Sequence, residues 1–215
     1  MKDLLSGLQA SVQNRFPAMA ASLRPGASEA QLDAFEAHIG QRLPAQFREL
    51  YRWHDGQDDD DGTALGLFVG LPFLPLAQAQ RHWQDECRAL DVPAAQQARD
   101  GQAYGCVPPG AIKPVPASRC WIPFADDGAG AFLGVDLDPG PAGQPGQVIT
   151  HGGREFVRVG AAPSLSVFLA DLLALYENQR YELIEQDDGE VSLGTLAPRT
   201  DHFMDYLRKV ALARP

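Results

Sequence analysis

Carboxylates are the side chains whose spacing in this sequence most suggests a chemical task. Four aspartates stand in a row from Asp58 to Asp61, and the pairs Asp126–Asp127 and Asp136–Asp138 flank a glycine-rich turn. Paired carboxylates can transfer protons or bind metal ions, and a run of them can steer a basic protein onto a surface. The aspartates are therefore the first candidates for a functional site.

Each of these acidic groups also has a plain structural explanation. Four adjacent charges without an apolar anchor are typical of a solvated loop, and the Asp127-Gly128 sequence is typical of a β-turn. The alternating oxygen ligands and distant glutamate of a calcium-binding loop are missing after Asp58. The tetrad leaves two interpretations open, a docking surface for a basic protein and a loop that serves solubility.

The histidines, cysteines and glycines form no recognised catalytic or metal-binding pattern. The five histidines show no paired-ligand spacing, whereas zinc needs three or four convergent ligands. The three cysteines never form C-x-x-C and have no evident base partner, so we expect reduced thiols. The sequence contains no G-x-S-x-G, Walker or G-x-G-x-x-G motif. We therefore expect a protein that is not an enzyme and that uses no metal and no cofactor.

The elements that must position these residues follow from hydrophobic periodicity and turn signals. Helices are predicted over six segments: 3–23, 29–39, 44–54, 76–98, 164–176 and 200–210. Strands are predicted as a four-stranded antiparallel meander and a later hairpin: 120–124, 131–136, 147–150, 155–159, 181–185 and 191–193. Residues 100–118 are rich in glycine and proline, so we expect them to be irregular.

Length and composition describe one substantial globular unit. The 215 residues are 45% hydrophobic and 21% charged, close to the average of globular domains. A net charge of −10 argues against direct nucleic-acid binding and suits a basic partner. We expect no membrane span, because no run of 18 apolar residues occurs, and a cytoplasmic location, because the cysteine spacing is typical of reduced thiols. We divide it into an N-terminal helical extension (1–27), a central domain (28–180) and a C-terminal hairpin and helix (181–215) packed on that domain.

Three blocks of the sequence resemble the SUKH superfamily, which is named for Smi/Knr-type regulators of the yeast cell wall and of killer-toxin resistance. The blocks follow the family's order over about residues 28–177: Leu43-Pro44 with Phe47, Leu50-Tyr51 and His54-Asp55-Gly56; Phe73–Leu76 with Trp83; and Trp121–Gly130 with Val135–Leu137 and Gly146–Ile149. Asp55 replaces the family's common asparagine, and Ala131 replaces a polar residue. The resemblance implies an α+β fold with a central antiparallel sheet flanked by helices, and no shared catalytic residues.

The resemblance suggests two kinds of binding protein. Many bacterial members are immunity proteins, so our first hypothesis is a protein that occludes a basic toxin domain, for example a nuclease, in a stoichiometric complex. The residues assigned to this contact are Asp58, Asp59, Asp60 and Asp61, with Asp55, Asp126 and Asp127 as weaker candidates. Eukaryotic members look like interaction hubs in cell-wall regulation, so our second hypothesis is a regulatory scaffold.

Overall fold

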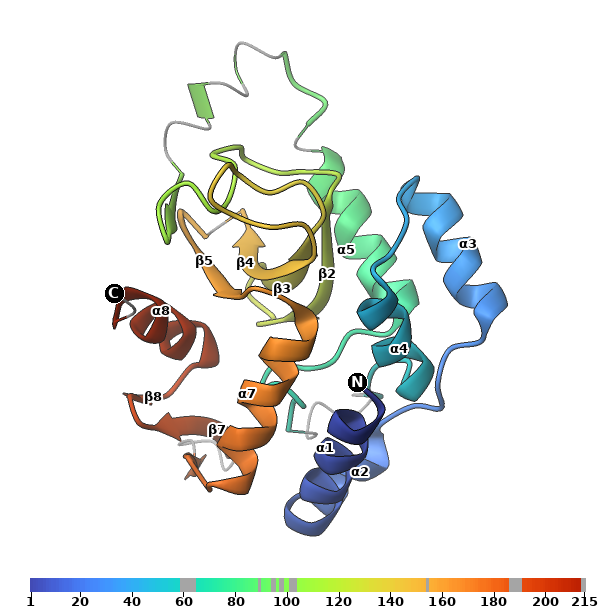
Figure 1. The fold of residues 1–215 in the computed structure, drawn as a ribbon, viewed down its shortest axis with the longest axis vertical. Helices are drawn as coiled ribbons and strands as arrows, with labels where there is room; N and C mark the ends of the chain where they lie inside the picture. Colours follow the sequence, from blue (N-terminus) through green and yellow to red (C-terminus); the bar gives the residue numbers. More distant parts are fainter. Residues whose placement is uncertain are drawn as a thin grey trace.

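The computed structural model describes residues 1–58, 65–88, 90–93, 96, 99–100, 104–153, 155–185 and 191–213. In this part of the chain a five-stranded sheet is flanked by helices, and a three-stranded sheet with a final helix follows it (Figure 1). This arrangement confirms the predicted α+β fold with a central sheet. None of the helices in these ranges is both long and apolar enough to cross a membrane.

The helices in the described ranges are α1 (Lys2–Arg15), α2 (Pro17–Ser22), α3 (Glu29–Ile39), α4 (Ala45–Trp53), α5 (Leu76–Arg88), α7 (Leu165–Glu177) and α8 (Phe203–Ala213). The Ser28 hydroxyl and the Gln31 side chain form the predicted capping box at the start of α3. The single helix predicted over 3–23 is wrong. Pro17 begins a separate helix, because a proline has no N–H to donate within a continuous helix but suits a first turn.

The strands are β1 (Gly105–Val107), β2 (Trp121–Asp126), β3 (Ala131–Asp136), β4 (Gln147–Gly152), β5 (Val157–Ala162), β6 (Tyr181–Glu185), β7 (Val191–Leu196) and β8 (Arg199–Thr200). The large sheet has the order β1-β5-β4-β3-β2, and β2 to β5 form the predicted antiparallel meander. The expectation that 100–118 is wholly irregular is wrong, because β1 pairs with β5 in parallel. A three-residue strand is too short to show a hydrophobic period, so its pairing is set by the fold around it.

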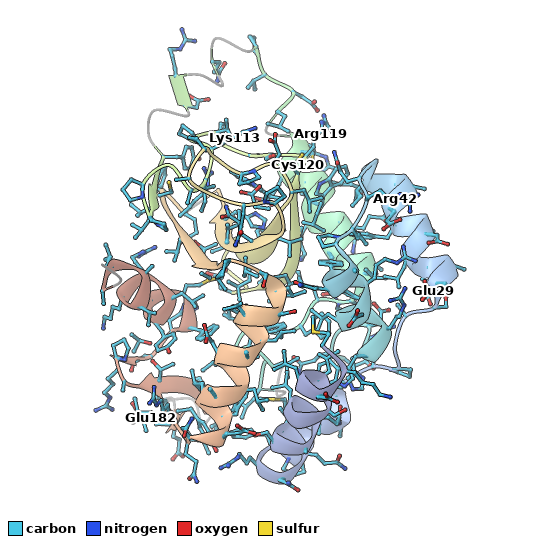
Figure 2. All side chains as sticks on the ribbon, in the orientation of Figure 1. Glu29, Arg42, Lys113, Arg119, Cys120 and Glu182 are labelled. Carbon is cyan, nitrogen blue, oxygen red and sulfur yellow. The ribbon has the colours of Figure 1, made fainter. Side chains whose placement is uncertain are left out.

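The two faces of the large sheet are covered differently. Apolar side chains on one face, such as Phe124, Leu133 and Val148, belong to the main hydrophobic cluster with α7. On the other face, Trp121 and Ile149 form a smaller cluster with the irregular segment 108–119. That segment lies at the end of the molecule marked by Lys113 and Arg119 (Figure 2). Helix α5 packs beside β2.

The main hydrophobic cluster contains residues from each of the three predicted segments, from Leu5 in α1 to Ala211 in α8. The ring of Phe16 contacts both Tyr176 and Tyr181, at centroid distances of 5.9 and 5.1 Å. The N-terminal helices, α7 and the small sheet therefore share apolar contacts. The division at residues 27 and 180 stays a prediction.

Tyr176→Phe should lower the free energy of unfolding by about 1–2 kcal/mol, because it leaves a buried carbonyl without a partner. The fully buried Tyr176 hydroxyl donates to the Leu67 carbonyl at 2.8 Å. Tyr181→Phe is the control, since Tyr181 is only half-buried and lies at the start of β6. Urea unfolding followed by circular dichroism measures both, and equal stabilities of the two variants would contradict the prediction.

Candidate functional site

Asp55, a predicted partner-binding residue, is buried and caps a helix. Its side chain Oδ1 accepts a hydrogen bond of 2.8 Å from the N–H of Leu76, the first residue of α5. The carboxylate thus satisfies a free amide at the positive end of the helix. Gly56 permits this approach, because its φ is +76° and a Cβ there would lie 2.3 Å from the Pro75 nitrogen. Asp55 is 8% exposed, so it offers almost no surface to a partner.

Asp58 is the one member of the acidic tetrad that the structure describes. Its exposed carboxylate pairs with the Arg24 guanidinium at 2.6 Å. Exposed ion pairs of this kind contribute little to stability. Asp59, Asp60 and Asp61 lie outside the described residues, as do Asp187 and Asp188 of the second predicted Asp-Gly turn. The tetrad's contact with a basic partner stays a prediction.

The carboxylates around 126–138 serve turns and the sheet. Asp127 Oδ1 accepts hydrogen bonds from the N–H groups of Ala129 and Ala131, both at 2.8 Å, which confirms the predicted turn. Asp126 faces His82 at 3.3 Å. Burial raises the pKa of Asp136, which accepts a bond from Gln147. Among the described residues, no group of three or more histidine, cysteine, aspartate or glutamate side chains could hold a metal ion.

A buried arginine lies between two aromatic rings on the second face of the sheet. The Arg158 guanidinium is 4.1 Å from the Tyr104 ring centroid and 4.4 Å from that of Trp121. It donates hydrogen bonds to the carbonyls of Val115 and Pro116, at 2.5 and 2.9 Å. Burial lowers its pKa to about 10. These contacts fasten the irregular segment 108–119 to β5 and partly offset the cost of burying the charge.

The arginine supports an exposed aromatic surface. Phe156 is 54% exposed, and its ring stacks on Tyr104 with a centroid distance of 5.4 Å and an interplanar angle of 20°. Val157 beside it is 44% exposed. We call Phe156, Tyr104, Arg158 and Trp121, which follow one another from the surface to the core, the aromatic stack. Large exposed apolar side chains that are held together mark interaction sites more often than isolated ones do.

The backbone that carries Phe156 is fixed on both sides. The preceding residue, Glu155, is buried; it accepts a hydrogen bond from the Thr150 hydroxyl at 3.1 Å and pairs with Arg208 of α8 at 3.3 Å. The Phe156 carbonyl itself accepts a 2.8 Å bond from the Gly105 N–H of β1. The exposed ring therefore stands on a constrained support, which reduces the entropy lost when a partner binds.

The sequence analysis missed this surface. It placed Phe156 in a strand over 155–159, whereas β5 begins at Val157, and it gave Tyr104 and Arg158 no role. One local signal was available, an aromatic residue soon after the Gly152-Gly153 turn. Tyr104, on which Phe156 stacks, lies 52 positions earlier in the chain, so no local pattern connects the two rings.

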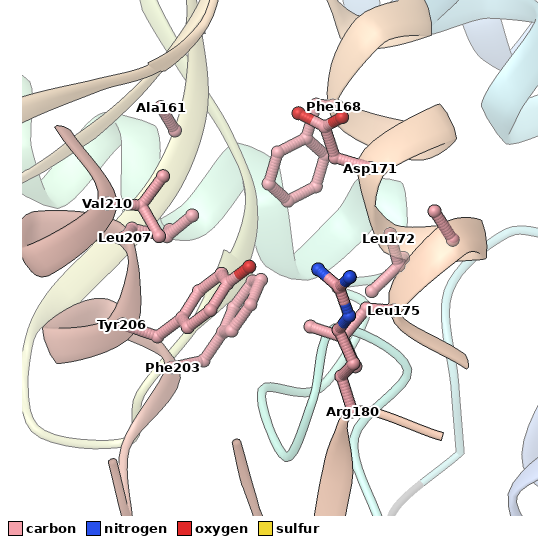
Figure 3. Close-up of a pocket in the computed structure, with 11 residues that line it drawn as sticks. Ala161, Phe168, Asp171, Leu172, Leu175, Arg180, Phe203, Tyr206, Leu207 and Val210 are labelled. Atoms are coloured by element: carbon pink, nitrogen blue, oxygen red, sulfur yellow. The ribbon is translucent and has the colours of Figure 1, made fainter. Parts of the chain in front are cut away.

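A second candidate is a cavity of about 290 Å³ between α7 and α8 (Figure 3). Its wall is largely apolar, with Phe168 and Leu172 on one side and Phe203 on the other. Asp171 and Arg180 are its charged lining residues. The volume lies at the lower limit of ordinary ligand pockets, so the cavity can accept a small group or a single side chain.

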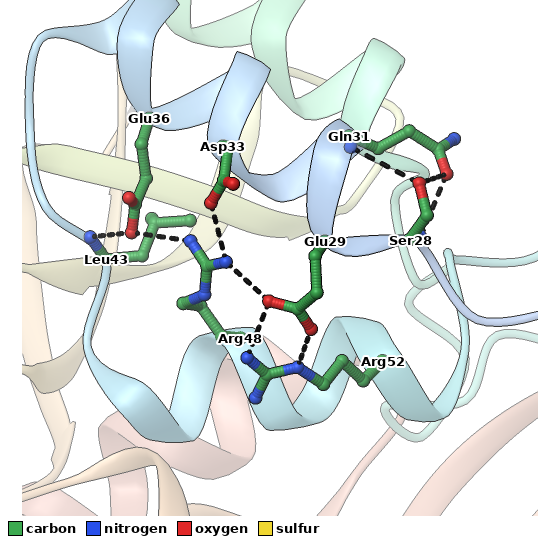
Figure 4. A network of polar contacts seen from close by, with 8 residues as sticks. All are labelled: Ser28, Glu29, Gln31, Asp33, Glu36, Leu43, Arg48 and Arg52. Carbon is green, nitrogen blue, oxygen red and sulfur yellow. Dashed lines mark hydrogen bonds and ion pairs between the residues drawn. The ribbon is translucent and has the colours of Figure 1, made fainter.

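A partly exposed network of charges joins α3 to α4 (Figure 4). Arg48 contacts Glu29 at 2.7 Å, Asp33 at 2.8 Å and Glu36 at 3.1 Å, and Arg52 also binds Glu29. The hydrogen bonds from Arg52 and Arg48 lower the pKa of Glu29 to about 2. Each charge in this network has a partner from the facing helix, so it serves to hold the two helices together.

Comparison with known proteins places most of the chain in one family model, described as the SMI1 / KNR4 family (SUKH-1), which matches residues 26–171. The "Cell wall biosynthesis/cell cycle regulator smi1" of Schizosaccharomyces pombe is 32% identical over 191 residues, covering 85% of this chain and 37% of that protein. The "Cell wall assembly regulator SMI1" of Saccharomyces cerevisiae is 27% identical over 201 residues, covering 80% of this chain and 39% of that protein.

A human protein also matches part of the chain. "F-box only protein 3" of Homo sapiens is 44% identical over 111 residues, covering 50% of this chain and 21% of that protein. The chain thus spans less than two fifths of the length of each of these three relatives. The family model includes the whole aromatic stack and ends within α7, before the small sheet and α8.

Asp55→Ala should lower the free energy of unfolding by about 0.5–2 kcal/mol, because it removes the acceptor for the first amide of α5. Asp58→Ala should change it by less than about 0.5 kcal/mol, since it breaks only an exposed ion pair. Urea unfolding of the two variants and the wild type provides the comparison. If Asp55→Ala were as stable as Asp58→Ala, the capping role would be refuted.

Glu29→Gln should destabilise the protein at neutral pH and have little effect below pH 2. The pKa of Glu29 is lowered in the folded state from 4.5 to about 2, so its stabilisation is fully present above pH 4.5 and is lost as the pH falls through about 2. The stability difference between wild type and variant, measured by urea unfolding at several pH values, should shrink across this window. Glu177→Gln, at an exposed carboxylate that ends α7 and lies outside this network, is the control.

Proposed function

Because this chain belongs to the SMI1/KNR4 family, we propose that it is a regulatory interaction protein that acts by binding a protein partner and not by catalysis. The two fungal relatives described above are named as regulators of cell-wall biosynthesis and assembly, not as enzymes. These names favour our second hypothesis, a regulatory scaffold, over the toxin-immunity hypothesis. The chain spans only 37% and 39% of these relatives, so they support the class of function and not a particular partner.

The aromatic stack is the contact surface that we assign to this function, and the exposure of Phe156 is the observation that carries the assignment. In the isolated protein the exposed part of the Phe156 ring remains in contact with water. A partner that covers the ring removes this apolar area from water, which contributes favourable free energy to binding. Aromatic and arginine side chains are also enriched where binding energy concentrates. The buried Arg158 holds Tyr104 beneath Phe156, so the surface is formed before the partner arrives.

The acidic residues contribute less to the proposed contact with a partner. Asp55 is buried at a helix start, Asp127 bonds two amides of its own turn, and Asp58 is paired with Arg24. The net charge of −10 still favours approach by a basic partner through long-range attraction. We therefore propose that the overall charge orients the partner and raises its association rate, whereas the apolar surface around Phe156 supplies the affinity.

Phe156→Ala should weaken partner binding by about 30-fold or more, the effect of losing roughly 2 kcal/mol at a central interface residue. Val167→Ala is the matched control, because Val167 is also an exposed apolar residue but lies on α7. Partners of the wild type are first identified by quantitative affinity purification from the source organism. Dissociation constants of the purified pair are then measured by calorimetry for the wild type and both variants.

The two variants should unfold at the wild-type urea concentration, because both side chains are exposed. A partner that binds Phe156→Ala and Val167→Ala with equal affinity would remove the aromatic stack from the interface. Phe156→Trp keeps a large aromatic ring at the site and should retain most of the binding.

A further inference from the structure

The outer edge of the small sheet presents unpaired backbone groups. The strand order β6-β7-β8 places β6 at an edge. The Leu196 N–H donates to the Arg180 carbonyl at 3.1 Å, so residues 180 and 196 lie at a hydrogen-bonded position of the ladder, although the Arg180 N–H itself bonds the Leu175 carbonyl. Because bonded and non-bonded pairs alternate in an antiparallel ladder, Tyr181, Leu183 and Glu185 direct their N–H and C=O groups away from β7.

This edge lacks most of the features that keep edge strands from pairing. The β6 sequence Tyr-Glu-Leu-Ile-Glu contains no proline, glycine or lysine, and its register with β7 runs without a bulge. Leu183, in the middle of the strand, is 57% exposed. Among the residues that the structure describes, none forms a ladder with the outer side of β6.

The strand is anchored at its start, which keeps the edge in place. The Tyr181 ring contacts Phe16 at 5.1 Å and Tyr176 at 5.8 Å, both residues of the main hydrophobic cluster. The Arg180 N–H at the same end donates to the Leu175 carbonyl of α7 at 2.9 Å. A strand that binds at this edge would therefore pair with a backbone that is already extended and anchored at its start.

The side chains of β6 define the chemistry of a matching strand. Glu182 and Glu185 are its charged residues, and it carries no basic one. Glu182 lies near the edge of the molecule (Figure 2). Its carboxylate Oε1 pairs with Arg199 at 2.7 Å. Side chains of neighbouring strands lie on the same face when they are directly opposite, so an apolar residue fits beside Leu183. Basic residues suit the rest of the segment, because both charged side chains of β6 are acidic.

We propose that the outer edge of β6 is a β-augmentation site that binds, antiparallel to it, an extended segment of a protein partner with alternating apolar and basic residues. Backbone hydrogen bonds to Leu183 supply affinity, the apolar residue opposite Leu183 sets the register, and the basic residues complement the acidic edge. This site is separate from the aromatic stack and does not rest on the function assigned to it.

The probe is an acetylated nine-residue peptide of alternating valine and lysine, labelled with a fluorophore, and its binding is followed by fluorescence anisotropy. In the proposed antiparallel register the valines lie directly opposite Leu183, so their amides pair with β6 and the lysine amides point away. N-methylation of the valines should weaken binding at least tenfold, whereas N-methylation of the lysines should leave it within threefold. Equal effects of the two modifications, a larger effect at the lysines, or no binding of the unmodified peptide at millimolar concentration would overturn the proposal.

A matched pair of protein variants tests the hydrogen bond that the Leu183 N–H would donate to the peptide. Leu183→Pro removes the outward N–H, which the β6–β7 ladder does not use, and an edge strand tolerates such a proline. It should weaken peptide binding at least tenfold, whereas Leu183→Ala, which keeps the N–H, should bind more tightly than Leu183→Pro. Circular dichroism verifies that both variants are folded, and the N-methylated peptides keep the test decisive if one is not.

The oligomeric state of the free protein decides between a partner segment and a second copy of the chain. Sedimentation velocity of the wild type should show a monomer whose mass does not change in Leu183→Pro. A wild-type dimer that becomes a monomer in Leu183→Pro would assign the edge to self-association and overturn the proposed occupant.

Discussion

The structure depends on hydrogen bonds to the backbone of one buried irregular segment, residues 65–75. This segment joins the helical first half of the chain to the sheet. Such a segment has no regular ladder of its own, so other groups must bond its polar atoms. The buried Gln57 side chain does much of this: its Oε1 accepts from the N–H groups of Leu67 and Phe73, at 2.8 and 3.0 Å, and its Nε2 donates to Leu65. A fully satisfied network of this kind fixes one arrangement of the chain.

Two buried tyrosines complete the same task and connect it to the core. The Tyr51 hydroxyl from α4 donates to the Leu74 carbonyl, and the Tyr176 hydroxyl from α7 donates to the Leu67 carbonyl, both at 2.8 Å. The Leu74 N–H in turn donates to the Phe124 carbonyl of β2 at 2.9 Å. The position of the sheet relative to α4 and α7 is thereby set, and with it the position of β5, which carries Arg158 of the aromatic stack.

Local signals in the sequence were sufficient where structure depends on near neighbours. The capping box of Ser28 and Gln31, the strand over 131–136 and the Asp127 turn are all predicted from residues within a few positions of one another. The same reasoning could not place Asp55, since its partner Leu76 lies 21 positions away, and an acid next to a charge run looks like surface. The stack of Tyr104 on Phe156 and the parallel pairing of β1 depend on distant contacts for the same reason.

The two proposed surfaces gain binding free energy from different interactions, so they recognise different kinds of partner. The aromatic stack gains free energy by covering apolar area, which is not directional, so it can accept any partner with a complementary apolar patch. The β6 edge gains free energy from backbone hydrogen bonds, which require an extended partner in register and an ordering of that partner on binding. The stack lies within the range matched by the family model and β6 lies beyond it. The stack is therefore formed entirely by residues of the matched range, whereas the edge depends on a part of this chain that the family model does not include.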